Sequence, residues 1–312
     1  MARILVTGTL AIDYAAKYPR TFAGLPRHDG INLSIHLSQI RRDFGGCAMN
    51  IAYSLALLGQ QPSPFAFVGA DYEPDFAGHL RTLGMDTSGI TMLEEAHSSH
   101  AFVITDANQN QFTGFYPGPA RSHDFLPRLH EFAERGFDYA VLAPDVPENM
   151  VDAARVMVEL GIPFLCDPGQ GLTDFQPSDS QRLTELSSSV ILNEYEHRTL
   201  QGHVGGALAK LDCLIVTLGS AGALWFERGH EAGRVPVVNV DDVTDPTGCG
   251  DAFRAGFVDA RLRGAEMQGA MRAGALTAAI SLTAPGPQRH TFGDYAARYA
   301  GAWGERPAWL PR

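Results

Sequence analysis

The feature that most constrains the fold is an alternation of short, strongly apolar runs with amphipathic segments along the 312-residue chain. Runs such as RILVTG, FDYAVLAP and CLIVTLG are typical of strands that are buried on both faces. Segments such as CAMNIAYSLALLG and NMVDAARVMVELG carry apolar residues at helical spacing and end at a glycine. Strands that alternate with helices predict an α/β fold, with a mostly parallel central sheet and helices on both of its faces.

Two segments break this alternation and predict a second, smaller sheet. In GINLSIHLSQIRRDF, apolar and polar residues alternate from Ile31 to Leu37, which predicts a half-buried strand. SHAFVITDANQNQFTGFYPG contains two β-rich runs around a polar turn. We expect these segments to form a β-sheet lid over a ligand site, and the alternative is an edge hairpin without a function. The predicted division is a lid of residues 15–42 and 97–118 and an α/β core of residues 1–14, 43–96 and 119–312.

Charge and cysteine content exclude several classes of protein. The formal net charge of −11 argues against nucleic-acid binding, which usually needs a basic face. The four cysteines are scattered, without zinc-ligand spacing, and this fits a reducing cytoplasm. The N-terminal MARILVTGTLAIDY is typical of a first strand rather than a signal peptide, and no run approaches the roughly 20 apolar residues of a membrane span. We expect a cytoplasmic protein with neither a nucleic-acid nor a membrane partner.

The segment DPTGCGDAFRAGF has the character of a phosphate-binding turn. Gly248 and Gly250 let the backbone turn tightly and approach a ligand closely. The helix that begins near Gly250 leaves its first N–H groups unpaired, and these groups bind phosphate well. Asp251 would repel that phosphate unless it takes a proton from a hydroxyl group that attacks it. The alternative is an ordinary aspartate at a helix N-terminus after a glycine turn.

A second glycine pair stands before an early helix. In FGGCAMN, Gly45 and Gly46 interrupt the chain, and Asn50 lies in the first turns that follow. Its amide offers a donor and an acceptor to a vicinal diol, although a surface asparagine after a glycine-rich helix start is the alternative. The chain contains no GxxxxGK[ST], no GxGxxG after the first strand and no GxSxG, so P-loop, dinucleotide-binding and α/β-hydrolase interpretations lack their motifs.

Together the two segments resemble the PfkB/ribokinase superfamily of sugar and nucleoside kinases. The positions that match its early pattern are Gly45, Gly46, Ala48, Asn50, Ala52, Gly59 and Gly69. The positions that match its late pattern, Asp-x-x-Gly-Ala-Gly-Asp, are Asp245, Gly248, Gly250, Asp251, Ala255 and Gly256. Cys249 departs from the family's alanine, which a turn that works through its N–H groups should tolerate. The resemblance implies a ribokinase-like fold and ATP-dependent phosphorylation of an alcohol.

The resemblance also assigns roles to individual residues. The residues implied in catalysis are Asp251 as the base and Gly248, Cys249 and Gly250 as the phosphate-binding turn. Those implied in acceptor binding are Asp13, which would hold sugar hydroxyls, with Gly45, Gly46 and Asn50. Without the resemblance, Asp13 would be a turn carboxylate at a strand end.

For the nucleotide side, the resemblance implies ATP, Mg²⁺ and a K⁺ ion. The implied nucleotide residues are Asn193, Thr217, Gly219 and Gly222, with Glu196 organising Mg²⁺ through water. K⁺ would lie near the loop that begins at Asp245, with the backbone near Asp245 and Thr247 as candidate ligands. TAPGPQRH resembles the loop beside the nucleotide base. The local alternatives are a helix N-cap with a capping glutamate for Asn193 and Glu196, and a tight hairpin turn for VTLGSAG.

The acceptor predicted from the resemblance is a nucleoside. CDPG and FTGFYPG look more like the bacterial and archaeal nucleoside or adenosine kinase branch than like ribokinase. Phe112, Phe115 and Tyr116 could form an aromatic wall for a purine, or pack between lid and core. We expect phosphorylation of adenosine to AMP. The alternatives are a kinase for fructose, ribose or a related sugar, and a non-catalytic ligand sensor on this fold. Because the lid often forms a dimer interface in this superfamily, we also expect a homodimer through the lid, with a monomer as the alternative.

Overall fold

A large, mostly parallel sheet forms the centre of the computed structural model, which describes residues 1–312 except 26–32, 73–74, 109, 120–123 and 311–312. The strand order is β13-β12-β11-β10-β9-β8-β1-β4-β5. Neighbouring strands from β5 to β11 pair in parallel, and β12 and β13 add an antiparallel edge. The strands are β1 (Arg3–Thr7), β4 (Gln61–Gly69), β5 (Ile90–Leu93), β8 (Tyr139–Leu142), β9 (Phe164–Cys166), β10 (Ser189–Asn193), β11 (Cys213–Thr217), β12 (Ala223–Glu227) and β13 (His230–Val235).

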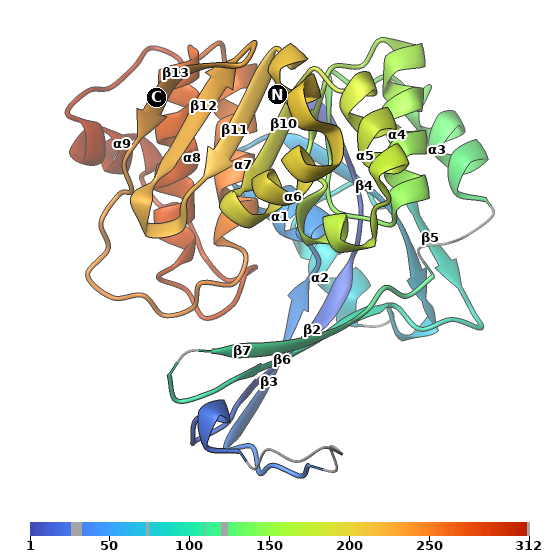
Figure 1. Ribbon diagram of the computed structural model, residues 1–312, viewed down its shortest axis with the longest axis vertical. Helices are drawn as coiled ribbons and strands as arrows, with labels where there is room; N and C mark the ends of the chain where they lie inside the picture. Colours follow the sequence, from blue (N-terminus) through green and yellow to red (C-terminus); the bar gives the residue numbers. More distant parts are fainter. Residues whose placement is uncertain (26–32, 73–74, 109, 120–123, 311–312) are drawn as a thin grey trace.

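Helices cover both faces of this sheet, as predicted (Figure 1). One group is α1 (Cys47–Leu57), α2 (Asp75–Thr82), α7 (Cys249–Leu262), α8 (Met267–Ser281) and α9 (Tyr295–Trp303). The other is α3 (Phe125–Ala133), α4 (Pro147–Leu160), α5 (Pro177–Leu186) and α6 (Glu194–Val204). Among the residues that the structure describes, no helix is both long and apolar enough to cross a bilayer.

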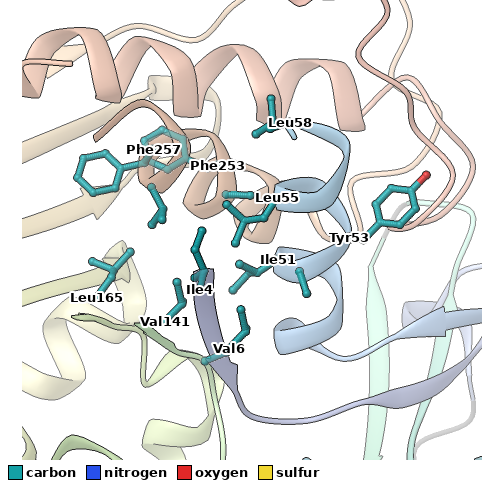
Figure 2. Packing of buried hydrophobic residues seen from close by; sticks show 14 of the residues in the cluster. Ile4, Val6, Ile51, Tyr53, Leu55, Leu58, Val141, Leu165, Phe253 and Phe257 are labelled. Atoms are coloured by element: carbon teal, nitrogen blue, oxygen red, sulfur yellow. The ribbon is translucent and has the colours of Figure 1, made fainter. Parts of the chain in front are cut away.

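Alternation along the strands divides the core into two clusters, one on each face. Ile4 and Val6 of β1 pack against α1 and α7, as Figure 2 shows, whereas Leu5 belongs to the cluster under α3 to α6. Helix α7 approaches α8 closely, since a Cβ atom on Gly256 would lie 2.1 Å from Thr277 Oγ1. This close packing fixes the axis of α7 and therefore the position of its N-terminus.

A separate four-stranded sheet stands off one end of the large sheet (Figure 1). Its order is β3-β2-β6-β7, and only the β2–β6 pair is parallel. The strands are β2 (Ala11–Lys17), β3 (Gln39–Gly45), β6 (Ser99–Thr105) and β7 (Gln111–Tyr116). Strands β2 and β3 therefore extend past the predicted limits of the lid, residues 15 and 42. The division into core and lid stays a prediction.

One predicted strand of this sheet is wrong. The alternating pattern placed a strand at Ile31–Leu37, but residues 33–37 form none, and residues 31 and 32 lie outside the described residues. Leu33 and Leu37 are exposed, and pairing with β2 begins only at Gln39. The alternation therefore lacks the packed surface that a half-buried strand needs.

Candidate active site

Helix starts and strand ends gather the predicted residues at one edge of the large sheet. Asn50 lies in the first turn of α1 and Asp251 in the first turn of α7. Asn50 Nδ2 donates a hydrogen bond of 2.8 Å to Asp251 Oδ2, although 201 residues separate them. The two glycine-rich segments FGGCAMN and DPTGCGDAFRAGF are therefore joined by one buried hydrogen bond.

Asp251 is a buried carboxyl group with a raised pKa. Its residue is 8% exposed. Burial raises the pKa to about 6, and Asp167 adds to the rise, while Arg254 and the hydrogen bond from Asn50 oppose it. At neutral pH the group is an anion, but it binds a proton more readily than a solvated aspartate. That balance suits a group that accepts a proton from an alcohol.

The turn before α7 requires glycine at Gly248. Its φ is +77°, and a Cβ atom there would lie 2.5 Å from Pro287 Cβ. The helix begins at Cys249, so the first N–H groups of α7 lie beside Asp251. The Cys249 N–H makes a hydrogen bond of 3.3 Å to the Pro246 oxygen. A Cβ atom on Gly250 would lie 2.9 Å from Arg254 Nη1, so this glycine leaves room for the guanidinium group.

The predicted acceptor residues Asp13, Gly45 and Gly46 lie close together. Gly45 packs against the Asp13 side chain, and Gly46 packs against the backbone just before and at the start of β2. A Cβ atom on Gly45 would lie 2.0 Å from Asp13 Oδ2, and one on Gly46 would lie 2.3 Å from the Thr9 oxygen. Asp13 Oδ1 is buried without a hydrogen-bond partner among the described residues. Burial, followed by the charges of three neighbouring aspartates, raises the pKa of Asp13 to about 7. A ligand that donates hydroxyl hydrogen bonds would satisfy this oxygen.

Register in the small sheet decides which aromatic residues face Asp13. Phe115 pairs with Ala101, and Ala101 pairs with Asp13, so Phe115 and Asp13 lie on the same face. Phe112 and Tyr116 lie on the opposite face, because successive side chains in a strand alternate. The predicted aromatic wall is therefore wrong for these two residues. Phe115 is the member of the three that remains on the Asp13 side.

Two arginines that the sequence analysis missed connect the small sheet to the core. Arg41 on β3 pairs with both Asp43 and Asp245. Arg289 Nη2 donates to Asp43 Oδ1 at 2.9 Å. The other oxygen of Asp245 accepts a hydrogen bond of 2.9 Å from the Thr247 N–H. Both carboxylate oxygens of Asp245 are thus engaged, one of them by a cation.

A buried ion pair, also missed, lies behind Asp251. Arg254 is 6% exposed and Asp167 is 1% exposed. Arg254 Nη2 donates to Asp167 Oδ1 at 2.7 Å, and Nε pairs with Oδ2. Burial and Asp167 raise the pKa of Glu196, and Arg254 opposes this. The available sequence signals were a charged residue inside the small-residue run of DAFRAGF and the aspartate of CDPG, which directly follows a strand.

The predicted nucleotide residues form a helix N-cap and a tight turn, the two local structures that were named as alternatives to a nucleotide site. Asn193 Oδ1 accepts from the Glu196 N–H at 2.9 Å, and Glu196 Oε2 accepts from the Asn193 N–H at 2.7 Å, which is a capping box. Thr217 ends β11, and Gly219 and Gly222 form the tight turn into β12. In the described part of the chain, no cluster of three or more His, Cys, Asp or Glu side chains could hold a metal ion.

Known proteins resemble this chain along most of its length. The nucleoside kinase of Methanocaldococcus jannaschii is 28% identical over 299 residues, which cover 92% of this chain and 93% of that protein. A deoxyribokinase of Salmonella typhi is 26% identical over 260 residues, covering 78% and 83%. The structure of Burkholderia thailandensis nucleoside kinase in complex with inosine has a TM-score of 0.87 and 32% identity, covering 98% of this chain and 99% of that one.

The ribokinase-like fold is confirmed by these structural similarities, which extend to a ribokinase from Cryptococcus neoformans at a TM-score of 0.78 and 20% identity, covering 96% and 100%. The profile for pfkB family carbohydrate kinase matches residues 1–291. That range includes both glycine segments, the Asn50–Asp251 contact and the loop around Gln288. The chain therefore belongs to the pfkB family of carbohydrate kinases.

Proposed function

We propose that this protein transfers the γ-phosphoryl group of ATP to a primary hydroxyl group of a nucleoside, with adenosine as the expected acceptor. The contact between Asn50 and Asp251 at the N-terminus of α7 carries the proposal. It places a basic carboxylate in the first turn of α7, close to the Asp13 carboxyl group, whose Oδ1 has no hydrogen-bond partner among the described residues. The similarity to the two nucleoside kinases supports a nucleoside over other acceptors.

In the proposed reaction, Asp251 takes the proton of the acceptor's hydroxyl group as its oxygen attacks the γ-phosphorus atom. The new P–O bond forms while the bond to the bridging oxygen breaks, and ADP leaves with that electron pair. The N-terminus of α7, which begins at the turn of Gly248, Cys249 and Gly250, stabilises the negative charge on the transferring group. Asp13 and Asn50 hold the sugar hydroxyls, and Phe115 packs against the base.

For Mg²⁺, the residues present fit the ion through water. The capping box uses Glu196 Oε2, which leaves Glu196 Oε1 for a water ligand of the ion. Mg²⁺ would neutralise phosphate charge there. We propose Asn193, Thr217, Gly219 and Gly222 as the nucleotide side of the site.

The donor set at Asp245 does not fit K⁺ well. Its carboxylate is already bound by Arg41 and by the Thr247 N–H, and the Arg41 charge would repel a second cation. Only backbone carbonyls near Asp245 and Thr247 remain as candidates. We therefore assign no step of the reaction to K⁺.

The pH dependence should show the raised pKa of Asp251. Because the base works as a carboxylate whose pKa is raised, kcat should rise with pH through a midpoint well above that of an unperturbed aspartate and then level off. An unperturbed aspartate would place this midpoint near pH ~4. Steady-state rates with saturating ATP and acceptor, followed from acidic to mildly alkaline pH, measure it. A midpoint at the unperturbed value would contradict the assignment of Asp251.

Replacing Asp13 should weaken acceptor binding selectively. In Asp13→Ala, the hydrogen bonds between sugar hydroxyls and a buried carboxyl group are lost, so KM for the acceptor should rise by about 10- to 100-fold. Asn50→Ala should act in the same direction. The KM for ATP serves as the internal control. A change confined to that constant would show that Asp13 does not bind the acceptor.

We also propose that the outer face of the small sheet forms a homodimer. Ile40 and Phe112 are 70% and 66% exposed, and Phe102 and Tyr116 on the same face are about half exposed. Light scattering should show a dimer for the wild type and a monomer for Phe112→Asp. Phe115→Asp, on the other face of the same strand, should stay dimeric. A monomeric wild type would contradict the proposal.

The activity itself is tested by ADP release across adenosine, inosine, cytidine, ribose and fructose. Efficient turnover of a purine nucleoside supports the proposal. Preferred turnover of ribose or fructose would favour the sugar kinase alternative, which the similarity to deoxyribokinase keeps open. Binding of a nucleoside without ADP release from any acceptor would favour a ligand sensor.

A further inference from the structure

Four side chains form one hydrogen-bonded row that ends at Asp251. His79 Nε2 lies 2.9 Å from Gln288 Oε1. Gln288 Nε2 donates to Asn50 Oδ1 at 2.8 Å, and Asn50 Nδ2 donates to Asp251 Oδ2 at 2.8 Å. Gln288, Asn50 and Asp251 are all buried. The row joins α2, the loop before α9, α1 and α7, which are far apart in sequence.

The direction of each hydrogen bond is fixed by its neighbours. A carboxylate only accepts, so Asn50 must turn its NH₂ group toward Asp251. Its carbonyl oxygen then faces Gln288, which must donate through its own NH₂ group. Gln288 Oε1 therefore accepts from His79, whose proton resides on Nε2. Every amide in the row accepts on one side and donates on the other.

Neighbouring residues hold His79 and Gln288 in place. His79 stacks on Phe44 with ring centroids 4.5 Å apart. The loop that carries Gln288 is tied to α1, because Tyr53 Oη donates to the His290 oxygen at 2.8 Å. In the same loop, Pro287 packs against the position where a Cβ atom of Gly248 would stand. Gln288 is thus held by the same segment that covers the phosphate-binding turn.

We propose that Gln288, supported by His79, is a positioning residue that locks the Asn50 amide with its NH₂ group toward the catalytic carboxylate. The inference rests on the proposed function, in which Asp251 is the base. Without Gln288, the Asn50 amide can rotate and place its carbonyl oxygen against Asp251 Oδ2, which repels the anion. Half of the hydrogen-bonding capacity of Asn50 remains for sugar hydroxyls, so the lock also orients the acceptor.

Other charged and titratable groups also act on Asp251, and they stay in place when Gln288 is changed. Arg254 lowers its pKa, and Asp167 raises it. The further neighbours from surrounding elements are Asp13, Cys47, Glu196 and Cys249. On the His79 side, burial and then the charge of Arg289 lower the histidine pKa, while the hydrogen bond with Gln288 raises it. A neutral replacement of Gln288 therefore tests the hydrogen bond without adding a charge.

The experiment compares Gln288→Met with Gln60→Met. Gln60 is a matched control, because it is also buried and donates at 2.7 Å to Asp259, another carboxylate of α7. Gln288→Met should move the acid limb of the kcat profile upward by about one pH unit and lower plateau kcat about tenfold. Gln60→Met should lose thermal stability without moving the limb. His79→Phe, which keeps the stack on Phe44, should move the limb by less in the same direction.

An unchanged limb and kcat in Gln288→Met would overturn the inference, as would an equal shift in Gln60→Met. If Gln288→Met does not fold, the His79→Phe result decides in the same way. Measuring Asp251→Asn in parallel separates a failure of the proposed function from a failure of the role assigned to Gln288. An active Asp251→Asn enzyme contradicts the proposed function, whereas an inactive one with a wild-type profile in Gln288→Met contradicts only the role of Gln288.

Discussion

Replacing Asp251 by asparagine is expected to lower kcat by about 10²–10⁴-fold, the usual contribution of a positioned general base. Asparagine has almost the same shape and still accepts the hydrogen bond from Asn50 on its carbonyl oxygen. The acceptor should therefore bind with nearly unchanged affinity, while its hydroxyl proton has no group to receive it. Rates of ADP release and calorimetric titration with nucleoside measure the two effects separately.

Asp259→Asn is the control for this loss. Asp259 is a second buried carboxylate of α7, paired with Arg263 away from the glycine turn. The same chemical change there should reduce stability and leave kcat within a few-fold of wild type. An Asp251→Asn enzyme that keeps most of its activity would show that another group accepts the proton.

Replacing Arg254 by methionine is expected to lower the free energy of unfolding by about 3–5 kcal/mol near neutral pH, the usual result of removing one partner of a buried ion pair. Asp167 would remain buried without its bidentate partner. Burial already raises the pKa of Asp167, and losing Arg254 raises it further. The folded variant should bind a proton there more tightly than the unfolded chain does, so the destabilisation should shrink as the pH falls. Urea unfolding at several pH values measures this.

A double-mutant cycle identifies the cause of that destabilisation. In Arg254→Met with Asp167→Asn, no unpaired charge is left in the pair, so part of the stability should return. A loss of under about 1 kcal/mol in the single variant, or strictly additive losses in the double variant, would show that the pair contributes little. The kcat profile of Arg254→Met should also move to higher pH, since Arg254 lowers the pKa of Asp251.

Local sequence signals predicted the parts of the molecule that depend on local physics. Apolar runs and helical periodicity indicated the mostly parallel sheet and its two helical layers, because burial imposes those patterns residue by residue. The glycines before Asn50 and before Asp251 marked two helix starts, and the structure begins α1 at Cys47 and α7 at Cys249. The family resemblance, rather than periodicity, then indicated that these two segments act together.

The features that local sequence patterns did not predict depend on tertiary contacts. The alternation in Ile31–Leu37 does not reveal whether a neighbouring strand is available, and none pairs with its described part. The face of Phe112 and Tyr116 follows from the register with β6. Gln288 and Asn50 are 238 residues apart, and Arg254 and Asp167 are 87 apart, so no local pattern connects either pair.

The most direct test is to identify the product formed from ATP and a purine nucleoside by phosphorus NMR. The proposed function predicts a nucleoside 5′-monophosphate formed in equal amount with ADP, and no phosphorylated product from the corresponding 5′-deoxynucleoside. ADP formed without a phosphorylated nucleoside, or phosphate attached to a secondary hydroxyl group, would contradict it.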